Sequence, residues 1–235
     1  MISHDLKCIF FHVTRTAGKS VEEKIFCTPP VYGSSDHSAP NDSLLNKSIT
    51  QDEFDEYFKF AFVRNTWDRV LSSFTHSHEY RYNIYGKSFI EIRKLFKEYV
   101  FNLPKPYLEN GVWLPKETPV RTQLHWTTLN GKGCLDFIGS FENLNQDFNK
   151  IRNKLLSNID DLDNDTLINT NKEIYTNNKN CITKSKFIEL ISGDLPHHNS
   201  SNRKPHSLYY DKDTINHVNE IFEDEINYFN FKFFN

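Results

Sequence analysis

The stretch IFFHVTRTAGKS, residues 9–20, constrains the fold of this chain more than any other segment. A run of apolar and aromatic residues stops at a small, basic, hydroxyl-rich loop that ends in Gly-Lys-Ser. The residues that follow place Val21 and Ile25 four positions apart, which predicts a helix over residues 18–26. A strand, an anion-binding loop and a helix in this order are typical of the first unit of an α/β fold.

The loop itself has the composition of a phosphate or sulfate site. The start of the helix directs several backbone N–H groups towards one point. The ATP-binding loop reads Gly-x-x-x-x-Gly-Lys-Ser/Thr, but this chain has Val13 where the first glycine belongs. The predicted anion ligands supply close backbone approach, positive charge or a hydroxyl donor: Arg15, Thr16, Ala17, Gly18, Lys19 and Ser20.

A second strand–turn–helix unit follows. YFKFAFV, residues 57–63, predicts a buried strand, and the next helix carries one apolar face consisting of Trp67, Val70, Leu71 and Phe74. A nucleoside triphosphatase needs a magnesium-binding acidic residue after such a strand, whereas this chain has Arg64. Ser72 lies two turns into the helix and can meet the phosphate that Arg64 binds. Asp68 complements the helix dipole.

Two separate anion sites predict one ligand with two separated phosphate groups, which ATP does not have.

Helices are predicted over residues 88–103, 143–159 and 212–229, a third strand over 134–143, and loops over 27–46, 102–119 and 160–180. The alternation predicts a P-loop-type α/β fold with a mainly parallel sheet flanked by helices on both faces. The length predicts one domain over residues 1–235.

Composition excludes some classes of protein. Lys and Arg number 28 against 31 Asp and Glu, so the net charge of −3 argues against a general nucleic-acid binder. No apolar stretch is long enough to cross a membrane, and the amino terminus has no signal pattern, so we expect a cytoplasmic protein without a membrane anchor. The cysteines are far apart, which disfavours a zinc site and suits reduced thiols.

Three segments resemble the carbohydrate sulfotransferase family. FFHVTRTAGKS resembles its 5′-phosphosulfate loop, Pro-Lys-Thr-Ala-Gly-Thr-Ser, and FKFAFVRNTWDRVLSSF resembles its 3′-phosphate motif, Phe-Val-Arg-Asn-Pro-Trp-Asp-Arg-Leu-x-Ser. FIGSFENLNQDF resembles its later Gly-x-Phe-Glu-Asn-Leu segment. The resemblance touches nearly the whole chain. It implies a sulfotransferase that takes a sulfuryl group from 3′-phosphoadenosine 5′-phosphosulfate (PAPS), releases adenosine 3′,5′-bisphosphate (PAP) and needs no metal.

The resemblance also implies roles for residues. Arg64 and Ser72 would bind the 3′-phosphate. Apart from the resemblance, Arg203 and Lys204 lie in a polar loop that could close over this phosphate, and a solvated charge pair is the alternative. Arg15 or Lys19 would neutralise charge on the departing 5′-phosphate; which of them contacts the bridging oxygen stays open, since they replace the family's lysine and threonine. His37 lies where the family has a histidine, and a histidine can accept a proton near neutral pH, so His37 is the predicted general base.

The acceptor would be a hydroxyl of a glycan or of another hydroxylated small molecule. Oligomeric state cannot be read from this sequence. Two alternatives remain: an ATP-dependent small-molecule P-loop kinase, and a non-catalytic nucleotide-binding module. His12, which ends the first strand beside the loop, is predicted to be a packing residue. Substitution of His37 separates an enzyme from a binding module.

Overall fold

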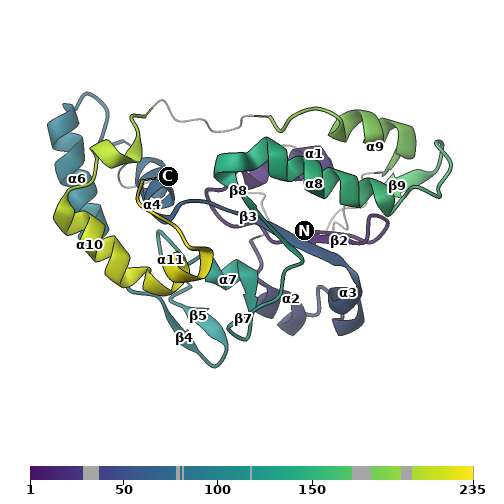
Figure 1. The fold of residues 1–235 in the computed structure, drawn as a ribbon, viewed down its shortest axis with the longest axis horizontal. Coiled ribbons are helices and arrows are strands. Elements are labelled where there is room, and N and C mark those ends of the chain that lie inside the picture. Colours follow the sequence, from purple (N-terminus) through teal and green to yellow (C-terminus); the bar gives the residue numbers. More distant parts are fainter. Residues whose placement is uncertain are drawn as a thin grey trace. The chain divides into compact units, whose positions relative to one another are not determined.

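A computed structural model describes residues 1–28, 37–77, 80, 82–116, 118–170, 181–196 and 203–234. The chain forms two compact units. Unit 1 consists of Met1–Val63 and Trp126–Ser200, and unit 2 consists of Arg64–His125 and Ser201–Asn235. Each unit is therefore built from two separate stretches of chain (Figure 1). The prediction of a single domain over residues 1–235 stays a prediction.

Unit 1 is built on a four-stranded sheet of order β1-β2-β3-β8. Its strands β2, β3 and β8 are parallel, and β1 pairs antiparallel with β2. The protein is therefore α/β with a mixed sheet. Because β2 and β3 are parallel, the segments that follow them leave the same edge of the sheet. The strands are β1 (Ile2–Ser3), β2 (Cys8–Phe10), β3 (Phe58–Val63) and β8 (Phe137–Ser140).

Alternate side chains of β2 and β3 enter two different hydrophobic clusters, as the two-residue period of a strand requires. Phe10, Phe60 and Phe62 are fully buried in one cluster with residues of α1, α8 and α9. Ile9 and Ala61 belong to a second cluster, which includes residues of α3. The two clusters explain why the predicted strands are apolar at nearly every position.

The helices of unit 1 are short. The longest is α8, with 14 residues, and none of the helices in the described ranges combines the length and apolar character needed to cross a membrane. Small two-stranded sheets, β6–β7 and β9–β10, complete the unit. The elements are α1 (Gly18–Phe26), α2 (Pro40–Leu45), α3 (Gln51–Glu56), α8 (Leu144–Ser157), α9 (Lys184–Ile191), the 3₁₀ helix η1 (Phe141–Asn143), β6 (Thr128–Leu129), β7 (Lys132–Gly133), β9 (Leu167–Asn169) and β10 (Cys181–Thr183). The four-residue α7 (Leu124–Thr127) contains the point at which the chain passes from unit 2 to unit 1.

Unit 2 has a helical core. The predicted apolar face of α4 is buried there, with Trp67, Val70, Leu71 and Phe74 all at most 3% exposed. Residues of α6 and α10 pack in the same cluster. The elements are α4 (Thr66–His76), α6 (Phe89–Phe101), β4 (Tyr107–Glu109), β5 (Val112–Leu114), the 3₁₀ helix η2 (His206–Leu208), α10 (Lys212–Ile221) and α11 (Glu223–Phe229).

The structure differs from the sequence prediction in several segments. The predicted loop over 160–180 contains β9, which pairs with β10, and the predicted strand over 134–143 is limited to β8, with η1 after it. The predicted loop over 102–119 contains the hairpin β4–β5, whose turn residues Asn110 and Gly111 have positive φ angles of 48° and 78°, as a tight two-residue hairpin requires. The predicted loop over 27–46 contains α2, which begins at a proline. The predicted terminal helix is broken at Phe222, because its φ of −109° and ψ of 24° leave the helical region.

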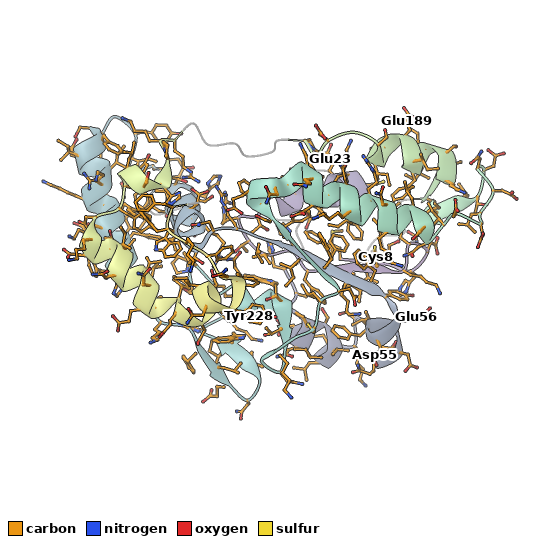
Figure 2. All side chains as sticks on the ribbon, viewed as in Figure 1. Cys8, Glu23, Asp55, Glu56, Glu189 and Tyr228 are labelled. Carbon is orange, nitrogen blue, oxygen red and sulfur yellow. The ribbon has the colours of Figure 1, made fainter. Side chains whose placement is uncertain are left out.

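The cysteines are free thiols. Cys8 lies inside unit 1, whereas Asp55, Glu56 and Glu189 project from its surface (Figure 2). Burial raises the pKa of the Cys8 thiol to about 12, and it does the same for Cys134. Both thiols are therefore protonated at neutral pH and poor nucleophiles.

Candidate functional site

The loop between β2 and α1 has an unusual backbone. Arg15 and Ala17 both adopt the left-handed region, with φ angles of 69° and 66°, which costs a non-glycine residue about 1 kcal/mol or more. Thr16 between them is fully buried, and its hydroxyl donates to the carbonyl of Val13 at 2.8 Å. Left-handed residues just before a helix start are typical of loops whose backbone N–H groups bind an anion.

His12 packs directly beneath this loop. It is 5% exposed, its ring stacks on Phe10 with centroids 5.7 Å apart, and its Nδ1 lies 2.6 Å from a carboxylate oxygen of Glu22. Because a carboxylate only accepts, Nδ1 donates to Glu22. Lys19 Nζ lies 3.7 Å from the other oxygen of the same carboxylate. His12 is therefore a buried positioning residue, in agreement with the packing role predicted for it.

The position of the His12 ring leaves room only for glycine at position 18. A Cβ at position 18 would lie 1.9 Å from Nε2 of the His12 ring. That ring cannot move easily, because Phe10 and Glu22 hold it. The sequence predicts that the small size of Gly18 lets an anion approach the backbone, which stays a prediction. The structure adds a second reason for glycine, because the ring of His12 fills the space of a Cβ at this position.

We expect Gly18→Ala to destabilise the protein by about 1–3 kcal/mol, the usual cost of forcing an extra methyl group into a packed site. In a chain of this size that lowers the thermal midpoint by about 2–12 °C. Gly193→Ala is the matched control, because a Cβ there meets only the end of the Lys24 side chain, at 3.5 Å. Equal midpoints for the two variants would contradict the assigned role of Gly18.

His37 lies beside His12 in unit 1, with ring centroids 4.4 Å apart. Its Nδ1 is 3.2 Å from the backbone carbonyl of His12, and its own carbonyl accepts a hydrogen bond from the indole of Trp126 at 2.9 Å. A carbonyl only accepts, so Nδ1 of a neutral His37 carries the proton and Nε2 carries the lone pair. The structure therefore brings the predicted base to the predicted loop and fixes its tautomer.

The remaining loop residues differ in their surroundings. The side chain of Lys19 is 18% exposed and Arg15 is partly buried. The hydroxyl of Ser20 donates to the carbonyl of Pro196 at 2.5 Å. That contact ties the start of α1 to the segment after α9, and residues 197–202 beyond it lie outside the described residues. Arg15 and Lys19 thus remain the two candidate cations of this loop.

The other predicted ligands gather in unit 2 around a single carboxylate. Arg64, 8% exposed, donates through Nε and Nη2 to Oδ2 of Asp68 at 2.8 and 2.5 Å. Nη2 of Arg203 donates to the other oxygen at 2.6 Å. Nη1 of Arg64 lies 3.4 Å from the hydroxyl of Ser72. Arg64, Ser72 and Arg203 are therefore neighbours, although 139 positions separate the two arginines in the sequence. We call these four residues the Asp68 cluster.

The Asp68 cluster is positively charged. Burial alone would raise the pKa of Asp68, but the guanidinium groups of Arg64 and Arg203 outweigh burial and hold it below its ordinary value. At neutral pH the cluster contains two guanidinium charges and one carboxylate charge, so the formal charges of its four residues sum to one positive charge. The planar forks of two arginines next to a hydroxyl are suited to a phosphate group. Sequence reasoning missed this role of Asp68, although the spacing of Arg64 and Asp68 is that of a helical ion pair.

A buried hydrogen-bond network holds the backbone of Arg64 in place. The side-chain amide of Gln123 accepts from the backbone N–H of Arg64 at 2.8 Å and donates to its carbonyl at 2.9 Å. Glu225, 1% exposed, anchors this amide. Its carboxylate accepts hydrogen bonds from the backbone or side chains of Gln123, Thr122, Thr66 and Arg69 at 2.7–3.3 Å. No local sequence pattern indicates this network, because its members come from α4, residues 122–123 and α11.

The predicted site residues thus form two groups. The loop of residues 15–20 and His37 lie in unit 1, and the Asp68 cluster lies in unit 2.

Across the described ranges, no group of three or more His, Cys, Asp or Glu side chains that could hold a metal ion is found. The prediction that the reaction needs no metal stays a prediction.

Comparison with known proteins identifies the family. Residues 1–232 match the model of the sulfotransferase family, so the match includes both groups of candidate ligands. The chain therefore belongs to the sulfotransferase family, which confirms the resemblance seen in its two loops. It is also 28% identical over 113 residues to an uncharacterized protein of Archaeoglobus fulgidus, covering 48% of this chain and 78% of that protein. No solved structure matches the chain.

Proposed function

We propose that this sulfotransferase transfers a sulfuryl group from PAPS to a hydroxyl of a carbohydrate or of another hydroxylated small molecule. The Asp68 cluster is the observation that carries the proposal. A separate 3′-phosphate distinguishes PAPS from ATP, and a positively charged cluster with two arginine forks supports binding of such a group. A kinase of P-loop type needs an acidic metal ligand after β3, where this chain has Arg64.

The loop of residues 15–20 would hold the other end of the donor. Its left-handed residues and the start of α1 support an anion site for the 5′-phosphosulfate. The donor supplies a sulfuryl group whose transfer leaves negative charge on the 5′-phosphate. Arg15 or Lys19 stabilises that charge. We also propose that the mixed sheet is the core of a P-loop-type fold, since β2, this loop and α1 follow in the required order.

His37 would remove the proton from the acceptor hydroxyl. The His12 carbonyl holds the proton of His37 on Nδ1, which leaves Nε2 as the basic nitrogen. Glu22 and Phe10 in turn hold His12, so the position of the base depends on a buried chain of contacts. The Trp126 hydrogen bond fixes the backbone of His37 from a second direction. These contacts support a base with a defined tautomer and orientation.

We expect His37→Gln to lower kcat about a hundredfold while leaving the affinity for PAP unchanged, because general-base catalysis contributes at least about that factor. Turnover is measured as transfer of labelled sulfate from PAPS to a panel of unsulfated glycans and phenols, and affinity by calorimetry. His4→Gln is the control, because His4 lies before the start of β2, whereas the loop of residues 15–20 lies after its end. Unchanged turnover would remove His37 as the base, and loss of PAP binding would make it a donor ligand instead.

A further inference from the structure

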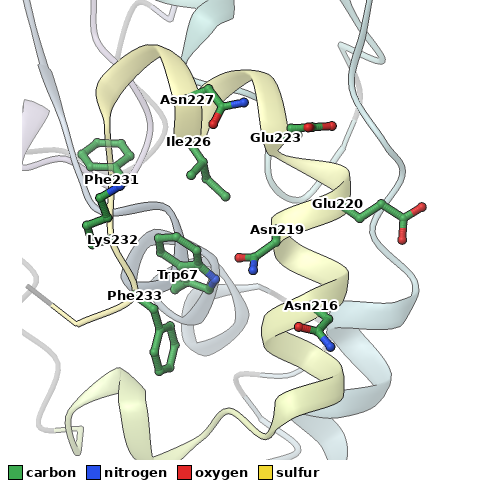
Figure 3. Close-up of a pocket in the computed structure, with 10 residues that line it drawn as sticks. All are labelled: Trp67, Asn216, Asn219, Glu220, Glu223, Ile226, Asn227, Phe231, Lys232 and Phe233. Carbon is green, nitrogen blue, oxygen red and sulfur yellow. The ribbon is translucent and has the colours of Figure 1, made fainter.

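Unit 2 contains a surface cavity, open to solvent, that none of the roles above uses (Figure 3). It has a volume of about 590 Å³, within the range of small-molecule sites. It is formed by α10, α11, the carboxyl-terminal segment and one residue of α4. The polar side chains that line it are three amides and two carboxylates with one amine: Asn216, Asn219, Asn227, Glu220, Glu223 and Lys232.

Trp67 gives the cavity an unsatisfied donor. The residue is 3% exposed, and its indole Nε1 is buried with no hydrogen-bond partner among the described residues. A buried N–H without a partner costs free energy, so an acceptor oxygen at this position would stabilise the folded state. Figure 3 shows the indole nitrogen on the side of the ring that faces Asn219. An oxygen of a ligand in this cavity would accept that hydrogen bond.

The cavity has the chemistry of a site for hydroxyl groups. Each asparagine amide both donates and accepts, and a hydroxyl group does the same, so several such amides can bind adjacent hydroxyls. Phe231 and Phe233 add apolar faces for the C–H side of a sugar ring. Glu220 and Glu223 against Lys232 leave a net negative charge, which disfavours a sulfated or phosphorylated ligand.

We propose that this cavity binds an uncharged polyhydroxylated ligand, namely an unsulfated sugar residue, with the Trp67 indole as a hydrogen-bond donor. The proposal goes beyond the transfer reaction and does not require it. The sugar comes either from the acceptor glycan or from a glycan that only recruits the protein. Both sources have the same chemistry, and sulfation of the bound sugar separates them.

The wall of the cavity is linked to the Asp68 cluster. Nδ2 of Asn65, the residue before α4, donates to the carbonyl of Lys232 at 2.7 Å. Nε2 of His206 lies 2.9 Å from the carbonyl of Phe233, and its Nδ1 lies 3.7 Å from Asp68. The carboxyl-terminal segment is thus held in place by residues next to the cluster. This preformed wall reduces the ordering cost of binding a ligand.

The indole N–H resonances of the protein test the proposal. The chain has three tryptophans, so Trp113 and Trp126 serve as internal references for Trp67. The full-length protein is titrated with neutral disaccharides (maltose, cellobiose, lactose and N,N′-diacetylchitobiose) and with a sulfated heparin disaccharide. We expect the Trp67 resonance to shift with at least one neutral disaccharide and not with the sulfated one. A resonance that no neutral disaccharide moves, or that only the sulfated one moves, overturns the proposal.

Substitution then locates the binding. Asn219→Ala is expected to weaken the affinity for the responding disaccharide about tenfold, and Trp67→Phe at least as much. Asn153→Ala, an exposed asparagine on α8, is the matched control. Equal affinity in all variants overturns the proposal. Binding of PAP is measured on the same samples, so failure of the donor site and failure of the sugar site are seen separately. Incubation with PAPS then shows whether the bound disaccharide is the acceptor.

Discussion

Arg64→Ala is expected to abolish measurable binding of PAP and, with it, sulfuryl transfer. The guanidinium of Arg64 is 8% exposed and already oriented by Asp68, so its hydrogen bonds to a phosphate form with little loss of side-chain freedom. Two charge-assisted hydrogen bonds together contribute about 4 kcal/mol, which corresponds to a roughly thousandfold loss of affinity. Arg64→Lys keeps the charge without the fork and should be intermediate.

Thermal stability measures this loss without knowledge of the acceptor. PAP at about 100 times its dissociation constant should stabilise the wild-type protein by about 2.7 kcal/mol. For a chain of this size the midpoint then rises by about 5–10 °C. Arg64→Ala should show no such rise. Arg93→Ala is the matched control, because Arg93 is an exposed arginine on α6. The midpoint of each variant without ligand shows whether the substitution itself unfolds the protein.

Comparison with ATP and magnesium separates the competing functions. A midpoint that rises with ATP and magnesium but not with PAP would identify the loop of residues 15–20 as a kinase loop. A rise with PAP that survives Arg64→Ala would show that the Asp68 cluster is not the 3′-phosphate site. A rise with PAP and no turnover with any acceptor, in a protein that His37→Gln does not change, would favour a non-catalytic binding module.

The two ligand loops could be predicted because the residues that identify each loop are close together in the sequence. Each candidate ligand of residues 15–20, together with Arg64, stands within a few positions of a strand end and a helix start, and Ser72 follows two turns into α4. The strand-to-helix order alone therefore places them. The family followed from the same local patterns. Arg203 was predicted from its place in a polar loop that could close over the 3′-phosphate, and the structure places it beside Arg64 through their shared contact with Asp68.

The parts that could not be predicted depend on contacts between distant residues. The sequence does not show that the ring of His12 occupies the space that a side chain at position 18 would need. Nothing near Arg64 indicates that Gln123 binds both of its backbone groups. The hairpin β4–β5 is a different case, since Asn110 and Gly111 are a known turn signal, but the surrounding prolines favoured a loop instead.

Glu225→Ala is expected to destabilise the protein by about 3–5 kcal/mol, the largest stability effect that we predict. The carboxylate is 1% exposed and Arg69 is fully buried, so the substitution leaves a buried guanidinium without its counter-charge. Burial lowers the pKa of Arg69, and Glu225 acts in the opposite direction. Thermal unfolding should show a midpoint lower by about 10 °C. Glu98→Ala on the exposed side of α6 is the control and should change the midpoint little.

The effect of Glu225→Ala should extend to the donor. Gln123 would lose the anchor for the amide that binds the backbone of Arg64, so PAP should bind more weakly even where the variant is fully folded. Replacing both charged residues, as in Arg69→Met with Glu225→Leu, removes the unpaired charge and should recover part of the stability; the rest stays lost, because Thr66, Thr122 and Gln123 still lack their acceptor. It should not recover PAP affinity, because the anchor of Gln123 is still missing. If the double variant recovers both, the network stabilises the unit without positioning Arg64.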